Sequence, residues 1–284
     1  MRERLGRVEG KVALVTGAGS APGPGYGTGK AISIALAREG AKLALVDLVP
    51  ERAEETKRLV EAEGSEAIVV KADCTKWQDC ANMVLEAVDK FGRLDILVNN
   101  LGLASFGLVT NMYEEEWDRA FNINVRTVFL ACKYAIPVML GQKSGSVINL
   151  SSLAARRPGR TIAYTASKAA VEAMTFDMAF AYGRDGVRVN CVLPGNINTP
   201  VAMAITQALP GSEEMIELRN NGGMLGIPGD AWDIAWAVVY LASDEARYVT
   251  GHTWPIESGS LRLSGLSLAP QIREIYDRFR EPKG

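Results

Sequence analysis

Short apolar segments alternate with longer amphipathic segments along most of the chain. The short segments are apolar at consecutive positions, as expected for strands that are buried on both faces. We interpret seven of them as strands, at residues 11–16, 41–47, 67–72, 94–99, 146–150, 187–193 and 252–256. The segments between them have helical periodicity and predict helices at residues 29–39, 51–63, 77–91, 114–140, 163–182 and 231–242.

Strands that alternate with helices predict a parallel sheet, because each crossover returns the chain to the same edge. The expected fold class is α/β: a doubly wound Rossmann fold with a seven-stranded, mostly parallel sheet and helices on both faces. No repeat or Ser/Gly-rich linker interrupts the alternation, so we expect residues 1–284 to form a single domain. Two segments lie outside this pattern, namely residues 198–229 and a C-terminal tail at 261–284 with an amphipathic helix at 271–280.

The composition argues against several classes of function. Lys and Arg total 31 against 33 Asp and Glu, and this balance gives no electrostatic reason to expect binding to nucleic acid or to a membrane surface. No apolar run has the length of a membrane helix, and the charged N-terminus lacks the core of a signal peptide. The four cysteines have no metal-ligand spacing and indicate reduced thiols in a cytoplasmic protein. With His252 as the only histidine, neither a multi-histidine metal site nor a histidine base is expected.

A glycine-rich turn between the first strand and the first helix indicates a dinucleotide site. Gly17 follows the strand, and Gly27 and Gly29 lie where the helix begins. Glycines here let the backbone turn sharply and approach a pyrophosphate, which accepts hydrogen bonds from the helix N-terminus. Asp47 ends the second strand 18 residues after Gly29, which suits the carboxylate that binds the adenosine ribose. This carboxylate repels a 2′-phosphate and the next two residues offer no cation, so NAD is favoured over NADP.

Tyr164 and Lys168 carry the strongest chemical signal. Residues four apart share one face of a helix. A tyrosine hydroxyl is a poor base at neutral pH, but a nearby ammonium favours the phenolate and lowers the tyrosine pKa. Such a tyrosine can accept a proton from an alcohol or donate one to a ketone. A Tyr-x-x-x-Lys pair alone is more often a surface pair, but its position after a serine-bearing strand favours a catalytic role.

These motifs, in this order, resemble the short-chain dehydrogenase/reductase family from about residue 10 to residue 260. The resemblance implies an oxidoreductase that transfers a hydride between nicotinamide and the carbon of a secondary alcohol or ketone. The family places three residues between its first two motif glycines, whereas nine separate Gly17 from Gly27 here. We therefore interpret residues 21–26 as an insertion.

The resemblance also implies cofactor contacts beyond the glycine turn. Asp73 matches the family's adenine-contacting aspartate, and Asn99-Asn100-Leu101-Gly102 matches its Asn-Asn-Ala-Gly motif with Leu in place of Ala. Residues 194–200 match the segment that binds the nicotinamide carboxamide. The complete predicted cofactor set is Gly17, Gly27, Gly29, Asp47, Asp73, Asn100, Gly102, Tyr164, Lys168, Pro194, Gly195, Ile197 and Thr199.

The catalytic set implied by the resemblance is Asn124, Ser152, Tyr164 and Lys168. The serine should stabilise charge on the substrate oxygen. Motif alignment favours Ser152, although the family's usual spacing to the tyrosine falls on Ser151. Side chains alternate along a strand, so only one of these two serines can face the site. Asn124, in preference to Asn122, matches the asparagine that helps to relay a proton from the lysine to solvent.

Further residues bear on substrate and assembly. Arg156, Arg157 and Arg160 follow the serine at the rim of the family's substrate pocket. They pair either with a substrate anion or, as we prefer, with solvent. Residues 198–229 correspond to the family's variable substrate lid. The family is commonly tetrameric, so we expect a homotetramer or homodimer that acts on a small alcohol or ketone. Two alternatives stay open, a carbonyl or 3-oxoacyl-type reductase and a non-catalytic dinucleotide-binding sensor.

Overall fold

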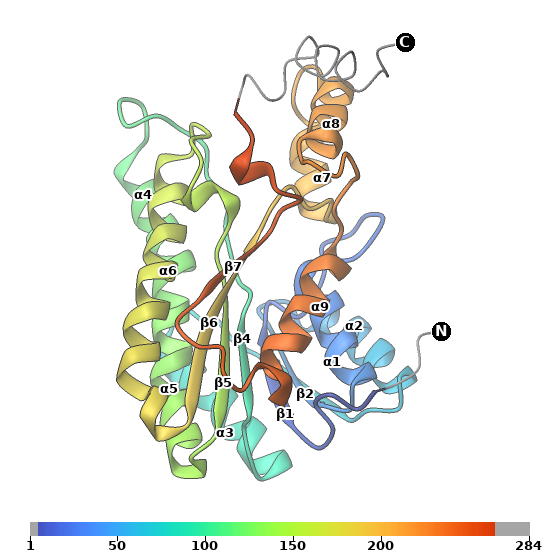
Figure 1. The fold of residues 1–284 in the computed structure, drawn as a ribbon, viewed down its shortest axis with the longest axis vertical. Coiled ribbons are helices and arrows are strands. Elements are labelled where there is room, and N and C mark those ends of the chain that lie inside the picture. The colour runs from blue at the N-terminus through green and yellow to red at the C-terminus, as the bar shows by residue number, and fades with distance from the viewer. Residues whose placement is uncertain (1–4, 265–284) are drawn as a thin grey trace, which may run out of the picture.

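A computed structural model describes residues 5–264 of the protein as a three-layer α/β fold (Figure 1). The described residues form one sheet with the strand order β3-β2-β1-β4-β5-β6-β7, and each neighbouring pair is parallel. The strands are β1 (Val12–Thr16), β2 (Lys42–Asp47), β3 (Ala67–Lys71), β4 (Ile96–Asn99), β5 (Gly145–Leu150), β6 (Val187–Pro194) and β7 (Thr253–Ile256). The predicted doubly wound Rossmann fold is confirmed, with every pair parallel rather than most of them.

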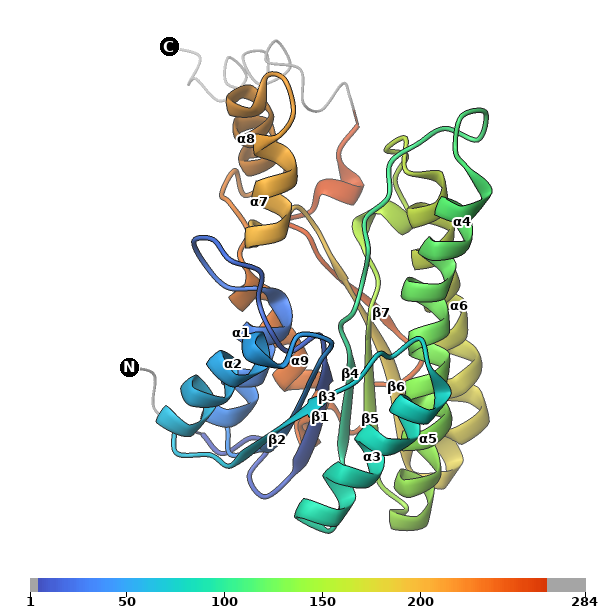
Figure 2. The same cartoon turned by 180° about the vertical axis from the view of Figure 1, so that it is seen from behind.

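Helices cover both faces of the sheet (Figures 1 and 2). One face carries α1 (Thr28–Arg38), α2 (Pro50–Ala62) and α9 (Ala231–Ala242). The other carries α3 (Trp77–Phe91), α4 (Glu114–Phe121), α5 (Thr127–Gln142) and α6 (Ile162–Tyr182). Two further helices, α7 (Pro200–Gln207) and α8 (Ser212–Asn221), project beyond the carboxyl edge of the sheet (Figure 1).

Strand β1 explains why the strands appear in the sequence as unbroken apolar runs. Ala13 and Val15 pack in the cluster beneath α1 and α9, whereas Val12 and Leu14 pack in the cluster beneath α3, α5 and α6. Successive side chains of a strand point to opposite faces, so a strand covered on both faces must be apolar at every position.

The helix predicted at residues 114–140 differs from the observed structure. One π-helical turn, Asn122–Arg126, separates α4 from α5, and the helix ends at Gln142. The turn follows from a tertiary contact, because buried Asn124 bonds to the backbone after β4. By length and mean composition alone, Glu114–Gln142 is long and apolar enough to cross a membrane, although charged residues interrupt its apolar run. Half of its most apolar window is buried inside the protein, as in a core helix.

The first and last residues of the segment predicted as a lid lie next to each other. Ile197 and Gly229 form an isolated parallel bridge, and Asn198 N donates to Gly229 O at 2.9 Å. Helices α7 and α8 lie between these two points. The helix predicted at residues 271–280 lies outside the described residues.

Candidate active site

The glycine turn packs β1 closely against the start of α1. Gly17 has a φ of +65°, which glycine adopts without strain. A Cβ added at Gly29 would lie 2.0 Å from Gly17 O, so only glycine allows this approach. Asn100 fixes the turn by donating from Nδ2 to Thr16 O at 3.1 Å and to Gly17 O at 3.0 Å. Leu101 also borders the turn, because a Cβ added at Gly17 would lie 2.9 Å from its Cδ2.

The N-terminus of α1 fits a phosphate group. Gly27 precedes the helix, no side chain caps its N–H groups, and its first turn contains no acidic residue. Free N–H groups and the positive end of the helix dipole favour an anion. The glycine cradle and this uncapped terminus therefore suit the pyrophosphate of a dinucleotide.

Two carboxylates lie at the carboxyl ends of β2 and β3, at the opposite end of the site from Tyr164. Asp47 accepts hydrogen bonds from Gly19 N at 2.9 Å and Val49 N at 3.0 Å. Hydrogen bonds from the Thr75 side chain, at 2.7 Å, and from its backbone hold the pKa of Asp73 below its usual value. Sequence reasoning overlooked Arg52, whose Cβ lies 2.5 Å from where a Cβ on Gly19 would stand.

Lys168 is buried beneath the loop that follows β4. Its Nζ donates to Leu150 O at 2.9 Å and lies 5.9 Å from the centre of the Tyr164 ring. Burial lowers the pKa of Lys168 to about 8. A Cβ added at Gly102 would lie 3.0 Å from this Nζ, so Gly102 borders the ammonium group.

The expected direction of the Tyr164 pKa shift is wrong for this structure. Burial raises the pKa of the half-buried phenol, and a hydrogen bond with the Ser152 hydroxyl offsets only part of that rise. With its Nζ 5.9 Å from the centre of the Tyr164 ring, the ammonium of Lys168 does not outweigh the burial of the phenol in this state. In this state the phenol is therefore protonated at neutral pH.

The two candidate serines point in different directions. Ser151 is buried, and its Oγ bonds to Lys168 O at 2.9 Å and to Glu172 Oε1 at 3.2 Å, within the protein. Ser152 lies beside the Tyr164 phenol and acts to lower its pKa, and its Oγ accepts a hydrogen bond from Ala154 N at 3.2 Å. Of the two serines, Ser152 is the one beside Tyr164.

Glu172 is a residue of this region that sequence reasoning missed. Its side chain is only 9% exposed and accepts a hydrogen bond from Arg156 Nε at 2.9 Å. Arg156 thus pairs with a carboxylate of the protein, rather than with a substrate anion or with solvent alone. The available signal was the position of Glu172, four residues after Lys168 and on the same helix face.

Asn124 joins three elements. Its Oδ1 accepts from Leu103 N at 2.7 Å, and its Nδ2 donates to Leu103 O at 3.0 Å and to Ser167 Oγ at 2.9 Å. Ser167 Oγ in turn donates to Tyr164 O at 2.9 Å. Asn124 therefore fixes the loop after β4 and the first turns of α6 relative to each other.

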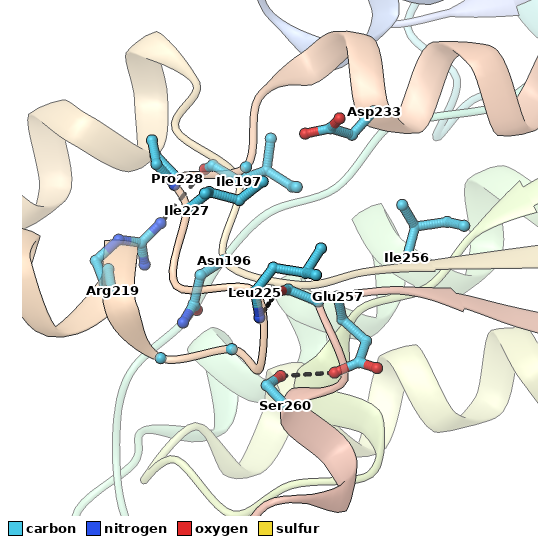
Figure 3. Close-up of a pocket in the computed structure, with 14 residues that line it drawn as sticks. Asn196, Ile197, Arg219, Leu225, Ile227, Pro228, Asp233, Ile256, Glu257 and Ser260 are labelled. Atoms are coloured by element: carbon cyan, nitrogen blue, oxygen red, sulfur yellow. Dashed lines mark hydrogen bonds between the residues drawn. The ribbon is translucent and has the colours of Figure 1, made fainter. Parts of the chain in front are cut away.

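The segment after β6 lies beside a pocket of about 200 Å³ between α8 and the end of β7 (Figure 3). Gly195 N donates to Ile256 O at 2.9 Å next to Pro194, and Ile197 O accepts from Arg219 Nη2 at 3.3 Å. Thr199 Oγ1 caps α7 by accepting from Ala202 N at 3.2 Å, which leaves its hydroxyl proton free to be donated. Arg219 Nε is buried without a hydrogen-bond partner.

The predicted residues fall in two groups along the carboxyl edge of the sheet. One group gathers where β4 and β5 end and consists of Gly102, Asn124, Ser152, Tyr164 and Lys168. The other consists of Asp47, the last residue of β2, and Asp73, which follows β3. The glycine turn after β1 lies between the groups, next to the β1/β4 point where the strand order reverses. Ligands of open α/β sheets bind at this point. The fold and the site thus define an α/β protein of the dinucleotide-binding class.

Comparison with known proteins narrows this class. The sequence model of a family described as enoyl-(acyl carrier protein) reductase matches residues 23–260. A 3-oxoacyl-[acyl-carrier-protein] reductase of Thermotoga maritima is 36% identical over 255 residues, which cover 89% of this chain and 98% of that protein. The chain belongs to the short-chain dehydrogenase/reductase family and is an oxidoreductase of the dehydrogenase/reductase type.

Solved structures agree with this assignment. A structure described as a short-chain dehydrogenase/reductase from Burkholderia xenovorans has a TM-score of 0.88 and 36% identity, over 91% of this chain and 99% of that one. Carveol dehydrogenase from Mycobacterium avium, solved in complex with NAD, has a TM-score of 0.83 and 31% identity, over 90% and 99% of the two chains. The family binds a nicotinamide dinucleotide.

Proposed function

We propose that the protein is an NAD-dependent dehydrogenase that interconverts a secondary alcohol and a ketone. The observation that carries this proposal is the cluster of Ser152, Tyr164 and Lys168 beside the glycine turn. A protein that only bound a dinucleotide would need the glycine turn but not a buried lysine beneath a tyrosine–serine pair. This argument disfavours the non-catalytic sensor.

The proposed mechanism assigns one role to each polar group. The nicotinamide, when bound, supplies the hydride acceptor for oxidation or the hydride donor for reduction. Tyr164 Oη exchanges the proton with the substrate oxygen, and Ser152 Oγ stabilises charge on that oxygen. Lys168 would hold the nicotinamide ribose, and its positive charge would favour the phenolate. Asn124 holds the loop that covers Lys168 and belongs to the path by which the proton reaches solvent.

NAD is the proposed cofactor because Asp47 presents a carboxylate where the adenosine ribose would lie. Backbone N–H groups hold this carboxylate in place, and it would repel a 2′-phosphate. Gly17, Gly27 and Gly29 would bind the pyrophosphate and Asp73 the adenine, with Asn100 and Gly102 bordering the cofactor between the glycine turn and Lys168. Pro194, Gly195, Ile197 and Thr199 would bind the carboxamide. The NAD complex of the similar carveol dehydrogenase supports this choice.

An absorbance screen tests the function and the cofactor together. Secondary alcohols, polyols and hydroxy acids are offered with NAD or NADP, and ketones and 3-oxoacyl thioesters with NADH or NADPH. We expect turnover with NAD(H) and little with NADP(H). Turnover with NADP(H) alone would reject the Asp47 argument and direct attention to Arg52. The 3-oxoacyl arm tests the alternative of a carbonyl or 3-oxoacyl-type reductase, which the Thermotoga relative supports.

Substitutions test the catalytic set once a substrate is known. Tyr164→Phe should lower turnover by about 10²–10⁴-fold, the usual contribution of a general acid or base. Ser152→Ala should lower it by about 10²–10³-fold, as for loss of an oxyanion donor. Ser151→Ala is the matched control: it removes one bond to Glu172 but leaves the bonds of Arg156 to that carboxylate, so it should lose much less activity than Ser152→Ala. NADH affinity, measured by fluorescence, should change little in all three variants, and wild-type turnover in Tyr164→Phe would reject the mechanism.

We also propose that the chain is one catalytic domain that assembles as a homotetramer or homodimer in the cytoplasm. Both core clusters pack on a single sheet, which supports one domain. Cys74, Cys80, Cys132 and Cys191 are free and buried, as suits a reducing compartment. Exposed phenylalanines on α5 and α6, namely Phe129, Phe176 and Phe180, support association through these helices.

A further inference from the structure

The inserted loop, residues 21–26, leaves the glycine turn and returns to it at one point. Gly27 N donates to Ser20 Oγ at 3.0 Å, so the residues that flank the insertion meet. The loop projects from the start of α1 towards α7 in both views (Figures 1 and 2). Removal of residues 21–26 would leave Thr-Gly-Ala-Gly-Ser-Gly-Thr-Gly, which has the family's usual spacing.

This loop contacts the start of α7 and the start of α9, the two helices next to the two ends of the segment 198–229. At one end, a Cβ added at Gly23 would lie 3.2 Å from Cβ of Pro200, the first residue of α7. At the other end, the Tyr26 ring packs edge-on against Trp232 in the first turn of α9, with ring centres 5.5 Å apart. The Arg38 guanidinium stacks on the same Trp232 ring at 4.7 Å, which holds that ring in place.

The two ends of the lid form a single hinge region. Besides the bridge between Ile197 and Gly229, α8 is bonded to the same strand end. Arg219 Nη2 donates to Ile197 O at 3.3 Å, and Asn198 Nδ2 donates to Asn220 Oδ1 at 2.8 Å. The inserted loop therefore contacts the region where the two ends of the lid meet.

We propose that residues 21–26 extend the dinucleotide site and couple it to the substrate lid. A pyrophosphate bound at the glycine turn would fix the base of the loop, and the loop would fix the hinge through Pro200 and Trp232. Binding of the dinucleotide then stabilises the lid before the substrate enters. This inference rests on the proposed function, because it requires a dinucleotide at the glycine turn.

Thermodynamic linkage gives the coupling two readouts. If bound dinucleotide raises the equilibrium constant for closing the lid by some factor, then closing the lid raises the affinity for the dinucleotide by the same factor. Arg219 reports on the lid, because it is the only Lys or Arg in residues 198–229 and trypsin cleaves after it. Cleavage requires α8 to open locally and release Arg219 from Ile197 O.

The experiment compares trypsin cleavage after Arg219, followed by mass spectrometry, with and without saturating NADH. In the wild type, NADH should slow cleavage by about tenfold, within the usual range of coupling between sites. In the variant without residues 21–26, NADH should still bind but slow cleavage by no more than about twofold. Its NADH dissociation constant, measured by fluorescence, should rise by the ratio of these two factors.

Two point variants guard against a folding defect in the deletion. Tyr26→Ala keeps the loop length but removes the contact with Trp232, and it should lose part of the NADH protection. Pro24→Ala lies in the same loop and alters neither hinge contact, so it should behave as the wild type. Full NADH protection in both the deletion and Tyr26→Ala would overturn the coupling. Failure of NADH to bind the wild type would overturn the proposed function, and the coupling with it.

Discussion

Tyr164 and Lys168 are affected by burial in opposite directions. Burial disfavours the charged form of each group, so the pKa of the phenol rises while that of the ammonium falls to about 8. Each charge is therefore costly to form in the protein. Burial of the Lys168 ammonium thus lowers the stability of the fold at the site where proton transfer is proposed, as is common at functional sites.

The variant Lys168→Met should separate this cost from function. The ordinary lysine pKa is 10.5, so at pH 7 the Lys168 ammonium has a higher free energy in the folded wild type than in the unfolded chain. We expect Lys168→Met to be inactive but more stable at pH 7, by up to about 3 kcal/mol before the lost bond to Leu150 O is deducted.

The stability difference between Lys168→Met and the wild type should shrink as the pH rises. As the pH rises from about 8 towards 10.5, the folded wild type loses its charge first and its stability increases relative to the variant. Urea unfolding at pH 7 and pH 10 measures the difference, with exposed Lys133→Met as the control. A stability difference that is the same at both pH values would contradict the assigned burial cost.

Individual residues differ in how well the sequence predicts them. The glycines of the turn and the Tyr–Lys pair follow from local chemistry, because spacing alone brings them to one turn or one helix face. The partner of Arg156 does not, since Glu172 lies on another element and reaches it only after folding. The direction of the Tyr164 pKa shift also depends on burial, which no local pattern contains.

At the scale of elements, one carboxylate fixes the loop that carries Ser152. Glu172 on α6 bonds to Ser151 on one side of Ser152 and to Arg156 on the other. The serine thus lies in a short segment held at both ends by a buried side chain of the next helix.

We therefore expect Glu172→Ala to impair both stability and turnover. Arg156 and Ser151 would lose a shared acceptor, at a cost of about 1–3 kcal/mol in the free energy of unfolding. Turnover should fall more than NADH affinity, because the loop of Ser152 is displaced while the glycine turn is unaffected. Glu172→Gln keeps an acceptor and should recover most of the turnover.

Urea unfolding, steady-state kinetics and NADH fluorescence test this expectation. Glu86→Ala, on the exposed face of α3, serves as the control for loss of a helix carboxylate. If Glu172→Ala kept wild-type turnover, then Ser152 would not depend on this anchor.

The strands were predictable because a doubly covered parallel sheet demands apolar residues at every strand position. The π-helical turn at Asn122–Arg126 was not, because it depends on a bond from Asn124 to Leu103 across two elements. The contacts of the inserted loop could not be predicted from the sequence either. Its six residues show only Gly and Pro content, whereas Pro200 and Trp232 are distant in sequence.

At the scale of the whole molecule, α5 and α6 lie side by side on one face of the sheet (Figures 1 and 2), and each carries exposed phenylalanines. Phe180 is 90% exposed and Phe129 is 52% exposed. Burial of one such side chain contributes about 1.5–3 kcal/mol. An isolated chain would leave this apolar area in water, which supports an interface on these helices.

If the proposed homotetramer or homodimer forms through these helices, Phe180→Asp should convert it to smaller species. Burying an unpaired carboxylate in the interface costs more free energy than burial of the phenylalanine contributes to association. The equilibrium therefore shifts towards monomers. Light scattering coupled to size-exclusion chromatography should give about two or four chains for the wild type and fewer for the variant. Leu85→Asp, on the exposed face of α3, is the matched control and should keep the wild-type mass. A monomeric wild type at all concentrations would remove this interface, while leaving the proposed chemistry of Ser152, Tyr164 and Lys168 within a single chain.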